Sequence, residues 1–168
     1  TTRKWNRPRK ADIARAKIVS VDPPFQTESA LVGNYATQLG IPFVSIDCSY
    51  EQALATEAAV VIISGEFRQR EYPGEEIEKL FAEYQSRAHG LVVFTVGDKE
   101  VLYGRRGEGC RRFSPYRVRV VDTAGAGDSF RAGIIYGLLQ QWEDSQMIEY
   151  ASAVAGLVCA SFPGVLNS

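Results

Sequence analysis

One short segment combines residue types that could do chemistry at the right spacing. Residues 121–130 read Val-Asp-Thr-Ala-Gly-Ala-Gly-Asp-Ser-Phe, and the pattern predicts an extended stretch, a Gly-Ala-Gly turn and a helix directly after it. Gly125 and Gly127 have no Cβ atom, so the backbone can adopt unusual dihedral angles and approach a ligand closely. The N–H groups of the turn and the positive end of the helix dipole would then meet at one spot. The segment therefore predicts an anion-binding site.

The carboxylate of Asp128 belongs to the first turn of that predicted helix, beside the anion site. A carboxylate is a poor phosphate ligand, but it can take the proton of a hydroxyl group that attacks a phosphoryl group. The anion site would hold the charge on the transferred phosphate. No Lys follows the glycines as a Walker A loop requires, and Phe130 stands where a dinucleotide-binding fingerprint requires Gly. A purely structural role, in which Asp128 favours the start of a helix, stays open at this point.

The elements that must position this segment are short apolar runs that alternate with amphipathic stretches. The runs predict strands at 18–22, 42–47, 60–63 and 91–96, and the stretches predict helices at 27–39, 51–57 and 75–87. Strands that are apolar on both faces are typical of a parallel sheet covered by helices. We therefore expect an α/β fold with an open, mostly parallel sheet and helices on both faces. Ligands bind at the carboxyl ends of such strands, which here carry Asp22, Asp47, Ser64 and Gly97.

The pattern changes after residue 97. Short strands are predicted at 101–103 and 117–121, joined by a turn around 107–109, and two helices are predicted at 127–141 and 144–162. We expect residues 17–168 to form one domain and residues 1–16 to form a basic arm. A polyanion-binding role for this arm, or for the arginines between 105 and 119, competes with the interpretation that these are solvated charges.

Composition excludes several classes of protein. The chain has 168 residues, a net charge of -1, 45% hydrophobic and 23% charged residues, which is ordinary for one globular domain. No apolar run reaches the roughly 18 residues of a membrane helix. Three widely spaced cysteines indicate a reducing compartment, so we expect a cytoplasmic protein, and a single His with no Cys pair offers no zinc site of known spacing. The first residue is Thr1 and the single Met is Met147, so we expect a portion of a longer chain.

The string Asp-Thr-x-Gly-Ala-Gly-Asp-x-Phe, followed by an apolar helix rich in small residues, resembles the C-terminal signature of the PfkB (ribokinase-like) carbohydrate kinases. The run at 94–98 is similar to the T-x-G segment of that family, and the run at 150–156 is similar to its last helix. The resemblance covers residues 17–165 and is specific over 91–137. It implies a ribokinase-like fold, and nothing in residues 1–17 resembles the sugar-binding motifs and β lid of the family's N-terminal part.

The resemblance also implies roles for individual residues. Asp128 would be the catalytic base in the transfer of the γ-phosphate of ATP to a sugar hydroxyl group, and the anion hole would consist of Gly125, Ala126 and Gly127. Contacts to ATP would come from Thr95, Gly97 and Ser152. A monovalent cation such as K⁺ would be held by Asp122 and the carbonyl group of Ala124, and Mg²⁺ would accompany ATP. The implied partners are a sugar and a nucleotide, with no nucleic acid or membrane; a homodimer formed through the lid stays open.

Departures from the family pattern keep other functions open. Glu100 stands where the family usually has Gly, and Ser64 and Phe67 replace the Asn and Glu of its N-x-x-E motif. These changes are compatible with a non-catalytic nucleotide-binding paralogue. The same signature also serves kinases of nucleosides or vitamin-like alcohols. Because the part that selects the acceptor is not seen in this sequence, we expect the 168 residues by themselves to be inactive, and the identity of the acceptor is not predicted.

Overall fold

A 6-stranded sheet forms the centre of the protein in the computed structural model, which describes residues 7–161. The strands lie in the order β1-β2-β3-β4-β5-β6. The first four are mutually parallel: β1 (Val19–Val21), β2 (Phe43–Ile46), β3 (Val60–Ser64) and β4 (Leu91–Val96). The last two are antiparallel: β5 (Glu100–Gly104) and β6 (Arg111–Phe113). The α/β fold with a mostly parallel sheet is thus confirmed.

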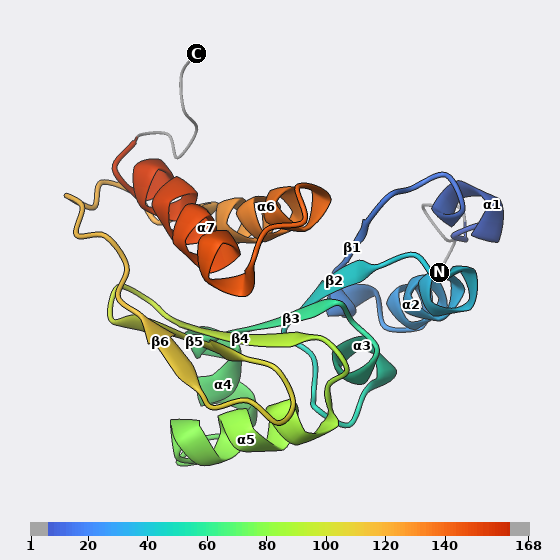
Figure 1. Ribbon diagram of the computed structural model, residues 1–168, viewed down its shortest axis with the longest axis horizontal. Coiled ribbons are helices and arrows are strands. Elements are labelled where there is room, and N and C mark those ends of the chain that lie inside the picture. Colours follow the sequence, from blue (N-terminus) through green and yellow to red (C-terminus); the bar gives the residue numbers. More distant parts are fainter. Residues whose placement is uncertain (1–6, 162–168) are drawn as a thin grey trace, which may run out of the picture.

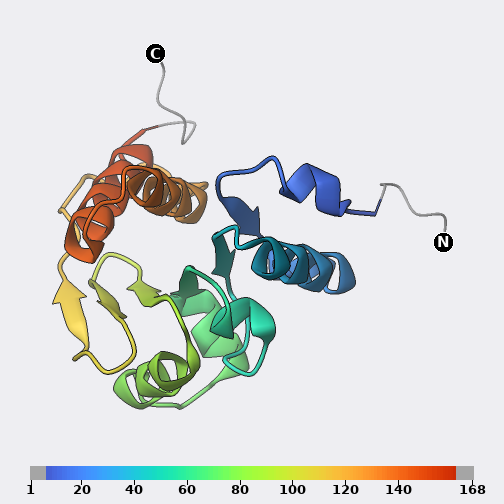
Figure 2. The same ribbon diagram turned by 45° about the vertical axis from the view of Figure 1, so that its right-hand side comes forward.

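Helices cover both faces of this sheet (Figure 1). One face carries α2 (Thr27–Leu39), α3 (Ala53–Thr56), α4 (Gly65–Glu71) and α5 (Ile77–Arg87). The opposite face carries α6 (Ala126–Leu139) and α7 (Asp144–Cys159). The short helices α1 (Lys10–Ile13) and η1 (Pro23–Phe25) flank β1. Figure 2 shows that α6 lies nearer to β1 than α7 does.

Alternate residues of each central strand supply the two cores, which explains why the strands are apolar throughout. In β3, Val61 and Ile63 pack against the helices α2–α5, whereas Val60 and Ile62 pack against α6 and α7. All four side chains are buried. A strand whose successive side chains point to opposite faces needs apolar residues at every position when both faces are covered.

Glycines bring α6 and α7 unusually close together. A Cβ atom added at Gly133 would lie 2.6 Å from the Cα atom of Ala151, and one added at Gly137 would lie 2.4 Å from the Cγ atom of Met147. Real Cβ atoms essentially never approach so closely. The small residues of α6 therefore set its position against α7, and with it the position of the turn at the start of α6.

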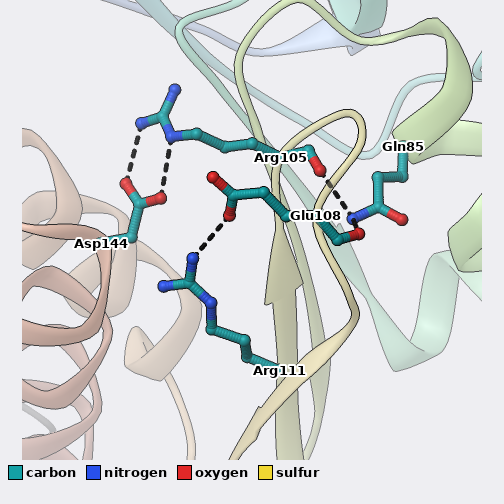
Figure 3. Close-up of polar contacts among 5 residues, drawn as sticks. All are labelled: Gln85, Arg105, Glu108, Arg111 and Asp144. Atoms are coloured by element: carbon teal, nitrogen blue, oxygen red, sulfur yellow. Dashed lines mark hydrogen bonds and ion pairs between the residues drawn. The ribbon is translucent and has the colours of Figure 1, made fainter.

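A polar network joins the β5–β6 turn to helices on both faces of the sheet (Figure 3). Arg105 makes two hydrogen bonds of 2.8 Å to the carboxylate of Asp144 in α7. The side-chain amide of Gln85 in α5 donates to the carbonyl oxygens of Arg105 and Glu108. Arg111 is paired with Glu108 at 2.6 Å. The positive charges of Arg105 and Arg111 are therefore paired with carboxylates of the protein itself.

Several predicted boundaries agree with the structure. The helix predicted at 27–39 is α2, and it ends at Gly40, whose φ of 65° is the left-handed conformation that glycine favours at a helix end. The strand predicted at 91–96 is β4. The two last helices start and end within a few residues of prediction; residue 162 lies outside the described residues.

The strand predicted at 117–121 is wrong. The turn around Gly107, where φ is 79°, returns the chain at once, so β5 pairs with residues 111–113. Residues 117–121 lie outside the sheet and adopt no regular structure. Val120 and Val121 are exposed, and the N–H of Val121 donates to the carbonyl oxygen of Cys159 at the end of α7. The prediction also missed α4, a short helix whose start is capped by Ser64.

Candidate active site

Polar and small residues gather at the edge of the sheet where the parallel strands end. Since β1 to β4 run in the same direction, their carboxyl ends meet at one edge. Asp22, Asp47 and Gly97 directly follow β1, β2 and β4, and Ser64 is the last residue of β3. This placement is the one expected for a ligand site in an open α/β sheet.

The start of α6 presents backbone N–H groups to open space. Gly125 precedes the helix with a φ of 78°, and no side chain caps the helix start. The N–H of Ser129 is bonded to the carbonyl oxygen of Gly125, whereas those of Gly127 and Asp128 have no acceptor within residues 7–161. A Cβ atom at Gly125 or Gly127 would meet no atom within 4 Å. Packing therefore does not require glycine at 127, and the turn has the form of an anion-binding cradle.

The segment that leads into α6 is held by α7 and by an internal turn. The N–H groups of Val121 and Asp122 both donate to the carbonyl oxygen of Cys159, at 2.8 and 3.2 Å. The Oδ1 atom of Asp122 accepts a 2.9 Å hydrogen bond from the N–H of Ala124. These bonds fix the backbone just before Gly125 and leave the second carboxylate oxygen of Asp122 available.

The side chain of Asp128 is 77% exposed and forms an ion pair with Arg131 one turn later. The Nη2 atom of Arg131 lies 2.7 Å from the Oδ1 atom of Asp128, and its Nη1 atom donates to the carboxylate of Asp22. The main-chain carbonyl of Asp22 in turn accepts from the hydroxyl group of Ser29 in α2. Asp128 is thereby connected to the carboxyl end of β1.

A second carboxylate at this edge is engaged with a hydroxyl group. Asp47 accepts bonds of 2.7 and 2.9 Å from the backbone N–H and the hydroxyl group of Ser64. Burial raises the pKa of Asp47, although both bonds from Ser64 act to lower it. The φ of Asp47 is 51°, a left-handed conformation that Asp adopts more readily than most residues. The hydroxyl oxygen of Ser64 also accepts from the N–H of Phe67, so this pair fixes the start of α4.

No hydrogen bond within residues 7–161 joins the residues predicted to contact ATP to Asp128. Thr95 is the penultimate residue of β4 and is paired with Ser64 in β3 and with Val101 in β5. Gly97 follows the strand with a φ of 58° and open space around it. Three strand spacings, about 14 Å, separate the ends of β4 and β1. Ser152 in α7 is only 5% exposed, and its hydroxyl group has no partner among the described residues.

Metal ligands are few at this site. Among residues 7–161 no group of three or more His, Cys, Asp and Glu side chains could hold a metal ion. Mg²⁺ bound with a nucleotide needs only one or two carboxylates, because phosphate and water oxygens complete its coordination. The exposed carboxylate of Asp128 and the half-buried carboxylate of Asp122 lie near the start of α6 and are compatible with that mode of binding.

Sequence reasoning missed the partner of Asp128. Arg131 is the single basic residue of the apolar helix α6, three positions after Asp128, so the spacing of an i, i+3 ion pair was a signal for it. The contact to Asp22, 109 positions away, had no such signal. Glu100, which stands where the family usually has Gly, has a partner in the structure: its carboxylate accepts a 2.5 Å hydrogen bond from Arg112.

Comparisons with known proteins place the chain in one family and match its fold to solved structures. The model of the pfkB family carbohydrate kinases matches residues 53–164. The 5-dehydro-2-deoxygluconokinase of Clostridium perfringens is 32% identical over 88 residues, which cover 52% of this chain and 25% of that protein. The ribokinase of Thermotoga maritima superposes with a TM-score of 0.78 at 16% identity, over 94% of this chain and 56% of that chain.

A second similar solved structure is the adenosine kinase of Schistosoma mansoni in complex with 2-fluoroadenosine. Its TM-score is 0.79 at 13% identity, and the match covers 94% of this chain and 54% of that chain. The sequence thus spans about a quarter of the length of the matched gluconokinase and just over half of the two solved kinases. Within residues 7–161, no helix is both long enough and apolar enough to cross a membrane.

Proposed function

The chain belongs to the pfkB family of carbohydrate kinases, and we propose that, as part of the full-length gene product, it transfers the γ-phosphate of ATP to a hydroxyl group of a sugar. The observation that carries this proposal is the start of α6. There, free N–H groups and two unobstructed glycines lie in the same turn as the carboxylate of Asp128. A site that holds a phosphoryl group beside a proton acceptor is what phosphoryl transfer to a hydroxyl group requires.

The proposed step has a simple balance of bonds. The O–H bond of the acceptor breaks, and its proton passes to Asp128. A bond forms between the acceptor oxygen and the γ-phosphorus, while the bond from that phosphorus to the bridging oxygen of ADP breaks. The N–H groups of Gly127 and Asp128 hold the oxygens of the transferred group, because they have no other acceptor within the described residues. Such donors stabilise the charge of the transition state without reorganising.

The nucleotide would lie along the carboxyl edge of the sheet. Thr95, Gly97 and Ser152 would contact its nucleoside part near β4 and α7, and the triphosphate would extend towards the start of α6. The separation of about 14 Å between β4 and β1 is compatible with an extended nucleotide. Mg²⁺ would neutralise phosphate charge, and a monovalent cation would bind at Asp122 and the carbonyl group of Ala124.

The acceptor is proposed at the level of its class. The matched 5-dehydro-2-deoxygluconokinases are named for a sugar acid, which makes a sugar or sugar acid the first candidate. A nucleoside is a second candidate, favoured by the structural similarity to an adenosine kinase. Both candidates use the same base and the same phosphate cradle, so the choice between them does not change the proposed mechanism.

The experiment is a phosphoryl-transfer assay on the full-length gene product with ATP and Mg²⁺. The acceptors are D-ribose, D-fructose, 5-dehydro-2-deoxy-D-gluconate, adenosine and inosine, and ADP formation is measured against a reaction without acceptor. We expect stimulation by a sugar or a sugar acid. Stimulation by a nucleoside alone would replace the sugar with the second candidate. Tight ATP binding with no stimulation by any acceptor would instead support a non-catalytic paralogue.

A further inference from the structure

Arg131 and Asp22 form a connection between Asp128 and the end of β1 that the proposed reaction does not itself require. We propose that these two residues are positioning residues that hold the carboxylate of Asp128 in the orientation needed to accept a proton. The inference rests on the proposed function, since it gives Asp128 the role of base. It assigns a role to two residues that lie outside the signature motif.

The geometry of Asp128 shows why it needs such support. Its side chain is 77% exposed, so no packing restricts its rotamers. Arg131 binds the Oδ1 atom at 2.7 Å, and the Oδ2 atom has no hydrogen bond to any described residue. One oxygen is therefore held in place while the other stays available for a proton. Displacement of a catalytic group by about 1 Å can cost about 100-fold in rate.

Arg131 is itself held firmly enough to act as an anchor. Its side chain is only 14% exposed, and its guanidinium group spans two carboxylates through different nitrogens. The planar fork of arginine can bind two carboxylates in fixed directions, which the single ammonium group of lysine cannot reproduce. The Asp22 carboxylate balances the charge of Arg131, so the cation does not act on Asp128 alone.

Asp22 connects this anchor to the sheet. It directly follows β1, and its carbonyl oxygen accepts a hydrogen bond from Ser29, which is buried in α2. The residues in the connection therefore come from α2, the end of β1 and α6, three elements that converge at the carboxyl edge. The start of α6 is thereby linked to the carboxyl end of the sheet.

The test compares Arg131→Gln with Arg105→Gln in the full-length gene product, using ATP, Mg²⁺ and the acceptor with the highest turnover in the assay above. Arg105 is a matched control, because it is also a partly buried arginine bound to an aspartate, Asp144, but lies on the β5–β6 turn. We expect Arg131→Gln to lower kcat about 10- to 100-fold with an unchanged KM for ATP. Arg105→Gln should keep kcat when assayed below its unfolding temperature. Equal kcat values for the two variants would overturn the proposal.

Two further comparisons separate positioning from general stability. Asp22→Asn retains an oxygen that can accept from Arg131, so it should keep more of the turnover than Asp22→Ala. In an Asp128→Asn background, Arg131→Gln should cause no further loss, because the group that it orients is gone. A further loss of the same size as in the wild type would contradict the positioning role. If Asp128→Asn alone keeps the wild-type kcat, the proposed function itself fails, which is a different result.

Discussion

Asp128→Asn is expected to lower kcat about 100- to 10,000-fold while leaving the affinity for ATP and the thermal stability close to wild type. Asparagine keeps the size and shape of the side chain and can still accept a hydrogen bond from Arg131. It cannot take up the proton of the attacking hydroxyl group. Because the Asp128 side chain is 77% exposed, its replacement removes little packing, so the loss should lie in turnover. The measurement is steady-state kinetics with isothermal titration of ATP binding.

Asp12→Asn is a close control for this variant. Asp12 is an exposed carboxylate that also pairs with an arginine three positions away, Arg9, at 2.8 Å. It lies in α1, away from the start of α6 (Figure 1). The control should turn over like the wild type. A turnover of the Asp128→Asn protein within a few-fold of this control would refute the assignment of the base.

Two glycines of α6 are expected to differ in what their replacement changes: Gly127 should affect turnover, and Gly133 should affect stability. Gly127→Ala should lower kcat about 100-fold, because a methyl group in the cradle displaces the phosphoryl group from the N–H donors. The fold should not suffer, since a Cβ atom there meets no atom within 4 Å. Gly133→Ala should instead destabilise the protein by about 1–3 kcal/mol, because its Cβ atom would lie 2.6 Å from the backbone of Ala151.

The two glycine variants form a crossed comparison that urea unfolding and kinetics can resolve. Gly127→Ala should lose turnover and keep its unfolding free energy, and Gly133→Ala should lose unfolding free energy first. If Gly127→Ala keeps full turnover, the open space beside it is not where the phosphoryl group binds. If it unfolds as easily as Gly133→Ala, the glycine is structural and the cradle has no special role.

Local patterns predicted much of the architecture because they act over a few residues. The side chains of β3 and β4 pack into the cores on both faces of the sheet. Their continuous hydrophobicity therefore indicates a parallel sheet covered by helices on both faces. Gly40 marks the end of α2 for an equally local reason, its left-handed φ. The strand predicted at 117–121 failed because strand formation depends on a neighbouring strand. Because the chain turns tightly at Gly107, residues 111–113 pair with β5, and residues 117–121 have no strand beside them.

In the candidate site, too, local structures could be predicted from the sequence and long-range contacts could not. The cradle at the start of α6 was predictable from the order of its glycines and Asp128, since a turn and a helix start are local structures. The contact between Arg131 and Asp22 was not, because it joins residues 109 positions apart and depends on how α6 crosses the sheet. Nor could the sequence indicate that the hydroxyl group of Ser152 is buried without a partner among the described residues, since burial depends on tertiary packing.

If the free N–H groups at the start of α6 bind the phosphoryl group, hydrogen–deuterium exchange should detect the contact. The N–H groups of Gly127 and Asp128 have no acceptor among the described residues, so they should exchange quickly in the free protein. The non-hydrolysable nucleotide AMP-PNP with Mg²⁺ should slow exchange in the peptide that spans 122–130. If equilibrium dialysis shows that the nucleotide is bound and exchange in that peptide is unchanged, the phosphate site lies elsewhere.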